Sequence, residues 1–267
     1  MTQRSSSRVV FWSVCVGHAT IDIFNGMGPV LLAFLSAHLL TMTNTQIGIA
    51  VSAYQLAGAL SQPLFGWLGD RNGGRWLGAG GVAWAVSMLV VSLAVAHFTR
   101  SYALMLIPYV LGALGSGAFH PVGAMHASEC DREHATTNTS IFFFMGQLGV
   151  ATGPALAGFL LDRLATHNNA LFTEPLGPAF AGALMERGAV LPLAMLGLVA
   201  IPTVLFMALT IPGAHIHTAR RLANAASDAA TTVQRGAFPV KAFLLFALIV
   251  ALRSLINPGM VAFIPRL

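Results

Sequence analysis

Long apolar stretches recur along the chain about every 30 residues, and short polar joints separate them. A helix needs about 20 consecutive apolar residues to cross the hydrocarbon core of a bilayer. Lipid offers the backbone no hydrogen-bond partner, so we expect each stretch to form a helix. The pattern predicts an all-α membrane protein with spans at Val9–Leu35, Ile47–Leu68, Trp76–Ala96, Tyr102–Met125, Ser140–Leu161, Ala189–Ile211 and Phe243–Ile264.

The composition agrees with this interpretation and excludes a soluble globular domain. Hydrophobic residues make up 56% of the 267 residues, charged residues make up 9%, and the mean hydropathy is +0.74. The two cysteines, Cys15 and Cys130, form neither a disulfide framework nor a metal-ligand spacing. The sequence also lacks a nucleotide-binding motif, so we expect no metal and no cofactor.

The net charge of +5 could suggest a nucleic-acid partner, but the basic residues sort by side of the membrane. The loops that follow the first, third and fifth spans hold only Arg100, Arg163 and Arg187. The N-terminus and the other loops hold Arg4, Arg8, Arg71, Arg75, Arg132, Arg220, Arg221, Arg235 and Lys241. This asymmetry predicts a cytoplasmic N-terminus in a multi-pass protein of a bacterial inner membrane, with lipid rather than nucleic acid as its partner.

A polar, basic segment separates the sixth predicted span from the seventh. We expect a six-helix bundle over 1–211, a cytoplasmic linker over 212–239 and a seventh helix over 240–267. Six spans, an inner linker and a further span are how a two-bundle transporter begins its second half. Twelve spans would need about 400 residues. The sequence therefore predicts an incomplete second bundle, through a fragment, an early stop or an incomplete gene model.

The segment Gly66–Arg75 reads GWLGDRNGGR and falls in the predicted loop after the second span. Glycine at both ends permits a tight turn, and the charges lie at the inner surface, so an ordinary charged turn is one interpretation. The segment also resembles the signature loop of the major facilitator superfamily, Gly-x3-Asp-Arg-x-Gly-Arg-Lys/Arg. The matching residues are Gly66, Asp70, Arg71, Gly73 and Arg75. The resemblance implies a gating role for Asp70, while Gly74 departs from the family's basic residue.

The segment Gly149–Gly158 reads GVATGPALAG and lies in the fifth predicted span. Small residues at every fourth position let helices approach closely, and Pro154 favours a bend. A generic tight helix crossing would explain this pattern. The segment also resembles the antiporter motif of the same superfamily, Gly-x3-Gly-Pro-x2-Gly-Gly, which implies antiport rather than symport. The matching residues are Gly149, Gly153, Pro154 and Gly158, with Ala157 in place of a glycine.

Three further segments narrow the resemblance. They are Gln46–Arg71, the stretch Gly115–Gly123 that reads GSGAFHPVG, and the Gly17-His18-x3-Asp22 pattern of the first span. Together they are similar to the fosmidomycin-resistance group of major facilitator exporters. That group often carries an acidic residue where Val122 stands here, so the resemblance leaves the identity of the cargo open.

Asp22 lies near the middle of the first predicted span. A charged carboxylate there costs about 2.5–3.5 kcal/mol, so we expect it to face a wet cavity or a partner. His18 precedes it by one helical turn and lies on the same face. His120 lies in the fourth span, before Pro121. The three side chains are candidates for carrying a coupling proton, and polar tethering between helices is the alternative for the two histidines.

The candidates for lining a substrate cavity are Asn25, Gln55, Gln62, Gln147 and Arg253. Arg253 lies midway along the seventh predicted span, and aligning Asn25 with Asn257 places it near the counterpart of Asp22. An acid and a base at equivalent depths could then face each other across the cavity. Pairing of Arg253 within the second bundle is the alternative.

These patterns together indicate part of a secondary transporter that exports small molecules by alternating access, with proton antiport. A symporter for a sugar or an organic acid is one alternative, against which the antiporter-like segment argues. A non-transporting half-bundle scaffold is another. An intramembrane enzyme at His18, Asp22 and His120 is a weaker interpretation, because no metal-ligand spacing supports it.

Overall fold

The computed structural model describes residues 2–166 and 196–212. Every regular element in these two ranges is helical, which confirms the predicted all-α architecture. The first five predicted spans each fall within one long helix, and part of the sixth falls within a shorter one. Nearly all of the expected linker, the expected seventh helix and Arg253 lie outside the described residues.

The five long helices extend beyond the predicted spans at one end or at both ends. They are α1 (Thr2–Leu35), α2 (Asn44–Asn72), α3 (Arg75–Thr99), α4 (Tyr102–Glu129) and α5 (Ala135–Thr166), and the shorter helix is α9 (Ile201–Thr210). Short helical turns follow α1 at Ser36–Leu40, precede α5 at Arg132–His134 and precede α9 at Leu196–Ala200. Among the described residues, four stretches are long and apolar enough to cross a membrane: Ser7–Leu40, Arg75–Thr99, Tyr102–Glu129 and Arg132–Leu161. Helix α2 is long enough, but its glutamines and serines make it less apolar.

Local chemistry explains where the helices begin. Thr43 accepts a hydrogen bond from the backbone N–H of Gln46, and the Gln46 side chain accepts one from the backbone N–H of Thr43. This capping box satisfies two backbone donors that α2 would otherwise leave unpaired. Ser101 accepts from the backbone N–H of Leu104 in the same way at the start of α4.

The segment Gly66–Arg75 is not the loop that the sequence predicted. Helix α2 continues to Asn72, so Gly66, Asp70 and Arg71 lie on its last two turns. The turn itself is confined to Gly73 and Gly74, and Gly73 has a φ of 79°, which favours glycine. The prediction failed because packing against neighbouring helices stabilises α2. The helix can therefore continue through glycines and charged residues that have low helix propensity or suit a turn.

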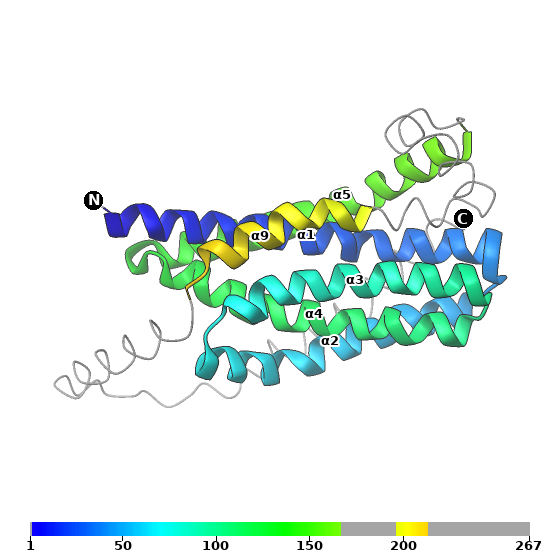
Figure 1. Cartoon of the computed structure of the whole chain (residues 1–267), viewed down its shortest axis with the longest axis horizontal. Coiled ribbons are helices and arrows are strands. Elements are labelled where there is room, and N and C mark those ends of the chain that lie inside the picture. The colour runs from blue at the N-terminus through cyan, green and yellow to red at the C-terminus, as the bar shows by residue number, and fades with distance from the viewer. Residues whose placement is uncertain (1, 167–195, 213–267) are drawn as a thin grey trace.

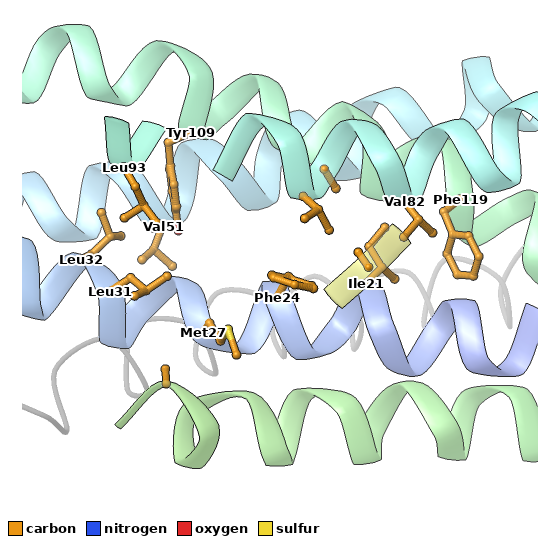
Figure 2. Close-up of a cluster of buried hydrophobic side chains, with 14 of the residues drawn as sticks. Ile21, Phe24, Met27, Leu31, Leu32, Val51, Val82, Leu93, Tyr109 and Phe119 are labelled. Atoms are coloured by element: carbon orange, nitrogen blue, oxygen red, sulfur yellow. The ribbon is translucent and has the colours of Figure 1, made fainter. Parts of the chain in front are cut away.

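The long helices run side by side along one axis (Figure 1). Helix α1 packs extensively against α5 and also contacts α3, α4 and α9, while α4 packs against both α2 and α3. Apolar side chains from α1 to α4 fill the space between these helices. Figure 2 shows this core, with Ile21, Phe24, Met27, Leu31, Leu32, Val51, Val82, Leu93, Tyr109 and Phe119 labelled.

Large apolar side chains also cover much of the outer surface. Trp76 is 77% exposed, Leu60 is 71% exposed and Leu209 is 80% exposed. Water would oppose so much exposed apolar area, whereas lipid tails do not. The surface therefore suits a bilayer, and the buried polar side chains inside it need a specific explanation.

Candidate functional site

Two histidines hold Asp22 in the interior of the bundle. The Nε2 atom of His18 lies 3.2 Å from Asp22 Oδ2, and the Nε2 atom of His120 lies 3.5 Å from Asp22 Oδ1. The side chains of His18 and Asp22 are 3% and 9% exposed, whereas that of His120 is 23% exposed. We call these three side chains the Asp22 cluster. They join α1 to α4 at the depth where the sequence placed the single mid-span acid.

Each histidine of the cluster has its second ring nitrogen committed to a backbone carbonyl. His18 Nδ1 lies 2.7 Å from the carbonyl oxygen of Phe142, and His120 Nδ1 lies 2.7 Å from that of Ser116. A carbonyl can only accept, so each Nδ1 carries a hydrogen and each Nε2 faces the carboxylate. A hydrogen bond from Nε2 to Asp22 then needs one more proton, held by the imidazole or by the carboxyl. The cluster can gain and lose protons while its heavy atoms stay in place.

Asn25 extends the cluster along α1. Its Nδ2 atom donates to Asp22 Oδ1 at 2.9 Å and to Ser116 Oγ at 3.2 Å. Its Oδ1 atom accepts the hydrogen of the Tyr54 hydroxyl from α2. Four helices therefore meet through hydrogen bonds at one place, because Phe142 brings in α5 as well. A buried polar network of this kind is stable only when its members are satisfied.

Helix α5 approaches α1 closely beside the cluster. A Cβ atom on Gly146 would overlap the His18 ring and lie 2.8 Å from Asp22 Oδ2, and one on Gly149 would lie 2.5 Å from the carbonyl oxygen of Ala19. Gly153 lies equally close to the backbone of α1. Gly158 differs, since a Cβ there would meet nothing within 4 Å. Gly149 thus brings α5 against Asp22, Gly153 packs against the backbone of α1 at Ile23 and Gly26, and Gly158 takes no part in this crossing.

The residues Gly66–Arg75 contact the far end of the bundle rather than the Asp22 cluster. Arg75 Nε donates to the carbonyl oxygen of Ile211 at 2.7 Å and so caps the last turn of α9. The Arg71 guanidinium lies 4.1 Å from the centre of the Trp67 ring, and Asp70 is exposed. Gly74 faces His126 so closely that an added Cβ would overlap the imidazole ring.

The structure does not bring the three glutamines to the Asp22 cluster. Gln55 and Gln62 on α2 and Gln147 on α5 are all exposed on the surface of the described residues. Of the candidate cavity residues, Asn25 alone joins the cluster, while Arg253 lies outside the described ranges.

Two groups in the described residues have ligand atoms within 4.8 Å of one another, a spacing that a metal ion could use. One is the Asp22 cluster, and the other comprises Asp131, Glu133 and His134, all exposed. A hydrogen bond from His134 holds the pKa of Asp131 below its usual value. This second group borders a cleft of about 1140 Å³ at the end of the bundle, beside Arg8 and Glu129.

Sequence reasoning missed several contributors to the site. The contact of Ser116 with the cluster could have been predicted, because Ser116 precedes His120 by one helical turn within the GSGAFHPVG stretch. The Phe142 ring is buried and stacks on His18 with ring centres 4.0 Å apart. Its backbone carbonyl accepts the hydrogen bond from His18, and no side-chain pattern reveals such a contact. Tyr54 lies within the segment Gln46–Arg71, but nothing in that segment indicates its contact with Asn25, and Gly146 stands in no motif.

Comparison with known proteins agrees with the architecture. Residues 14–267 match the sequence profile of the Major Facilitator Superfamily. The putative multidrug resistance proteins MdtD of Yersinia pestis (strain Pestoides F) and of Yersinia pseudotuberculosis (serotype O:1b, strain IP 31758) are each 28% identical over 182 residues. The alignment covers 66% of this chain and 37% of each relative, so the chain matches little more than a third of their length. On the match over nearly its whole length, this multi-pass membrane chain belongs to the Major Facilitator Superfamily, a family of transporters.

Proposed function

We propose that the chain is part of a proton-coupled exporter of small molecules and that the Asp22 cluster carries the coupling proton. The observation that carries the proposal is a buried carboxylate that lies between the Nε2 atoms of two histidines. The Nδ1–H group of each histidine already donates to a backbone carbonyl. A charge at this depth costs about 2.5–3.5 kcal/mol unless it is compensated. A cluster that holds one proton is neutral overall, and a second proton gives it a charge of +1.

This change of charge offers a coupling mechanism. The partly exposed face of His120 gives protons a route to the cluster, whereas Asp22 and His18 are buried. Alternating access would open that face first to one side of the membrane and then to the other. A cargo that stabilises one protonation state of the cluster then links its own passage to that of a proton.

Several features support export of small molecules by antiport. The antiporter-like segment lies directly against Asp22 at Gly149. The chain resembles the fosmidomycin-resistance group, and its MdtD relatives are named putative multidrug resistance proteins. Both likenesses favour drugs or drug-like molecules as the class of cargo. We propose that the exposed Gln55, Gln62 and Gln147, together with Asn25 and Arg253, face a wet substrate cavity, because exposed amides are costly against lipid.

We further propose that Gly66–Arg75 forms the inner gate and that the N-terminus is cytoplasmic. The gate residues are Gly66, Asp70, Arg71, Gly73 and Arg75. Arg75 supports this proposal because it ties the start of α3 to the end of α9. Movement of either helix end would break that contact.

The test replaces Asp22 with asparagine in the protein expressed from its whole coding sequence. Asp22→Asn keeps the shape and much of the hydrogen bonding but removes the titrating charge. We expect everted membrane vesicles to lose proton-driven accumulation of ethidium or fosmidomycin, while binding without an energy source survives in part. Asp131→Asn is the matched control, since it removes an exposed acid that also contacts a histidine. Concentration of cargo against its gradient by the Asp22→Asn protein would refute the assignment.

His18→Gln tests the role of the buried histidine. Glutamine places its amide near the former position of Nε2, so it can still donate to Asp22 but cannot hold a second proton at the cluster. We expect the pH optimum of transport to shift more than the maximum rate falls. A large fall in maximum rate at an unchanged optimum would assign His18 to helix tethering instead.

A further inference from the structure

We propose that Tyr54 and Asn25 are positioning residues that direct the coupling proton to one oxygen of Asp22, namely Oδ2 on the side of His18. The inference rests on the proposed function, because it concerns the proton that the Asp22 cluster would carry. Asn25 contacts the carboxylate directly, and Tyr54 acts on it through its hydrogen bond to Asn25.

Tyr54 fixes the orientation of the Asn25 amide. Its hydroxyl donates a hydrogen to Asn25 Oδ1 from a partly buried position on α2. The opposite orientation of the amide would place an oxygen 2.9 Å from Asp22 Oδ1, and the two acceptors would repel each other. The contacts of Oδ1 with Tyr54 and of Nδ2 with Asp22 therefore favour the same orientation of the Asn25 amide. Tyr54 reinforces this orientation, in which the nitrogen faces Asp22.

Asn25 in turn makes the two oxygens of Asp22 unequal. One hydrogen of Nδ2 goes to Asp22 Oδ1 and the other to Ser116 Oγ. A proton on Oδ1 would compete with the amide hydrogen that this oxygen already accepts. Oδ2 faces His18 Nε2 at 3.2 Å and is not a partner of Asn25. Oδ2 is therefore the oxygen that can take a proton and share it with His18.

Gly146 keeps that side of the carboxyl free. A Cβ at residue 146 would overlap the His18 ring and crowd Asp22 Oδ2. In the described part of the chain, the ionisable groups that face Asp22 are His18 from its own helix, His120 from α4 and the phenol of Tyr54 from α2. The contact on the His120 side is longer, at 3.5 Å, and shares its oxygen with Asn25.

Removing the Tyr54 hydroxyl should release this arrangement. In Tyr54→Phe the amide of Asn25 loses its anchor, and Asp22 Oδ1 loses a well-placed donor to its charged form. A carboxylate with fewer donors holds a proton more readily, so the midpoint of the transport pH profile should move to higher pH by about one unit. The proton would also spread over both oxygens, which changes the hydrogen bonding of the carboxyl.

Tyr109→Phe provides a matched control. The Tyr109 ring lies 5.2 Å from the Tyr54 ring, lines the same small cavity and is buried, whereas Tyr54 is partly buried. Its hydroxyl makes no hydrogen bond to Asn25 among the bonds of the described residues. A loss of packing or of buried polarity in this region affects both tyrosine variants, whereas release of the amide affects only Tyr54→Phe.

The experiment measures infrared spectra of the purified full-length transporter in lipid across a pH series. The difference between wild type and Asp22→Asn identifies the carboxyl band of Asp22. We expect Tyr54→Phe and Asn25→Ala to move that band and its pH midpoint, while Tyr109→Phe leaves both unchanged. A band that stays in place in Tyr54→Phe, or moves equally in Tyr109→Phe, would overturn the proposal. If the band moves but Asp22→Asn still transports against a gradient, the positioning role stands and the coupling role fails.

Discussion

The glycines of the antiporter-like segment allow a sharp test, because the structure assigns them different surroundings. Gly149→Ala would place a Cβ 2.5 Å from the carbonyl oxygen of Ala19 and 3.1 Å from Asp22 Cβ. Ordinary contact begins at 3.4 Å, so α5 and α1 must separate by about 3.4 − 2.5 = 0.9 Å. Gly158→Ala makes the same chemical change within the same helix and meets nothing within 4 Å.

Two effects oppose each other in these variants. Alanine favours a helix over glycine by about 1 kcal/mol, which both variants gain. Overpacking a close contact costs about 1–3 kcal/mol, which only Gly149→Ala incurs. The net expectation for Gly149→Ala is destabilisation by up to about 2 kcal/mol, which lowers the melting temperature by about 4–8 °C at most. Gly158→Ala should melt at or slightly above the wild-type temperature.

The assay is thermal unfolding of the purified proteins in detergent, followed by proton-driven transport in vesicles. A separation of 0.9 Å would also stretch the hydrogen bond from His18 Nδ1 on α1 to the carbonyl oxygen of Phe142 on α5, which is 2.7 Å long. We therefore expect Gly149→Ala to lose transport by more than its loss of stability alone would cause. Equal behaviour of Gly149→Ala and Gly158→Ala in both assays would refute the view that the segment acts through its packing on α1.

Two further predictions concern the contact of Arg75 with α9 and the orientation of the chain in the membrane. Arg75→Lys keeps the charge but removes the Nε donor to Ile211, so the free energy of unfolding should fall by about 1–3 kcal/mol, measured by thermal unfolding. Arg71→Lys, at an exposed position over Trp67, should change it by less than about 0.5 kcal/mol, and a reversed order would contradict the capping role. Single cysteines at the exposed Thr45 and Arg132, in a protein lacking Cys15 and Cys130, test the orientation. An impermeant thiol reagent should label intact cells at Thr45 and not at Arg132, and the opposite result would invert the proposed topology.

The apolar periodicity was sufficient to predict the helices, because a bilayer imposes one length and one type of secondary structure on every span. The spacing of His18 and Asp22 likewise predicted a contact, since residues four apart share a helix face. The predicted loop at Gly66–Arg75 was wrong over its first seven residues. Polar residues at the end of a span do not distinguish a loop from a helix that continues into the interface.

The contacts between helices could not be predicted in the same way. No spacing within α1 indicates that a carbonyl of α5 or a hydroxyl of α2 lies beside His18 or Asn25. Backbone carbonyls carry no sequence identity, so the partner of His18 Nδ1 is invisible until the helices are packed. Gly158 shows that a motif match does not guarantee a contact either, because a Cβ added there would meet nothing within 4 Å.

The sequence presented the buried acid and the antiporter-like segment as separate features. In the structure they depend on each other. Asp22 needs polar partners, and His18 can serve only if its own Nδ1 hydrogen finds an acceptor inside the bundle. That acceptor is the carbonyl oxygen of Phe142, which reaches His18 because bare backbone at Gly146 and Gly149 lets α5 approach α1. A side chain at either glycine would withdraw the acceptor from His18 and crowd Asp22 at the same time. The close crossing of α1 and α5 is therefore a condition for keeping the Asp22 cluster hydrogen-bonded in the interior of the bundle. Under the proposed function, movement between these two helices would change how tightly the cluster holds its proton.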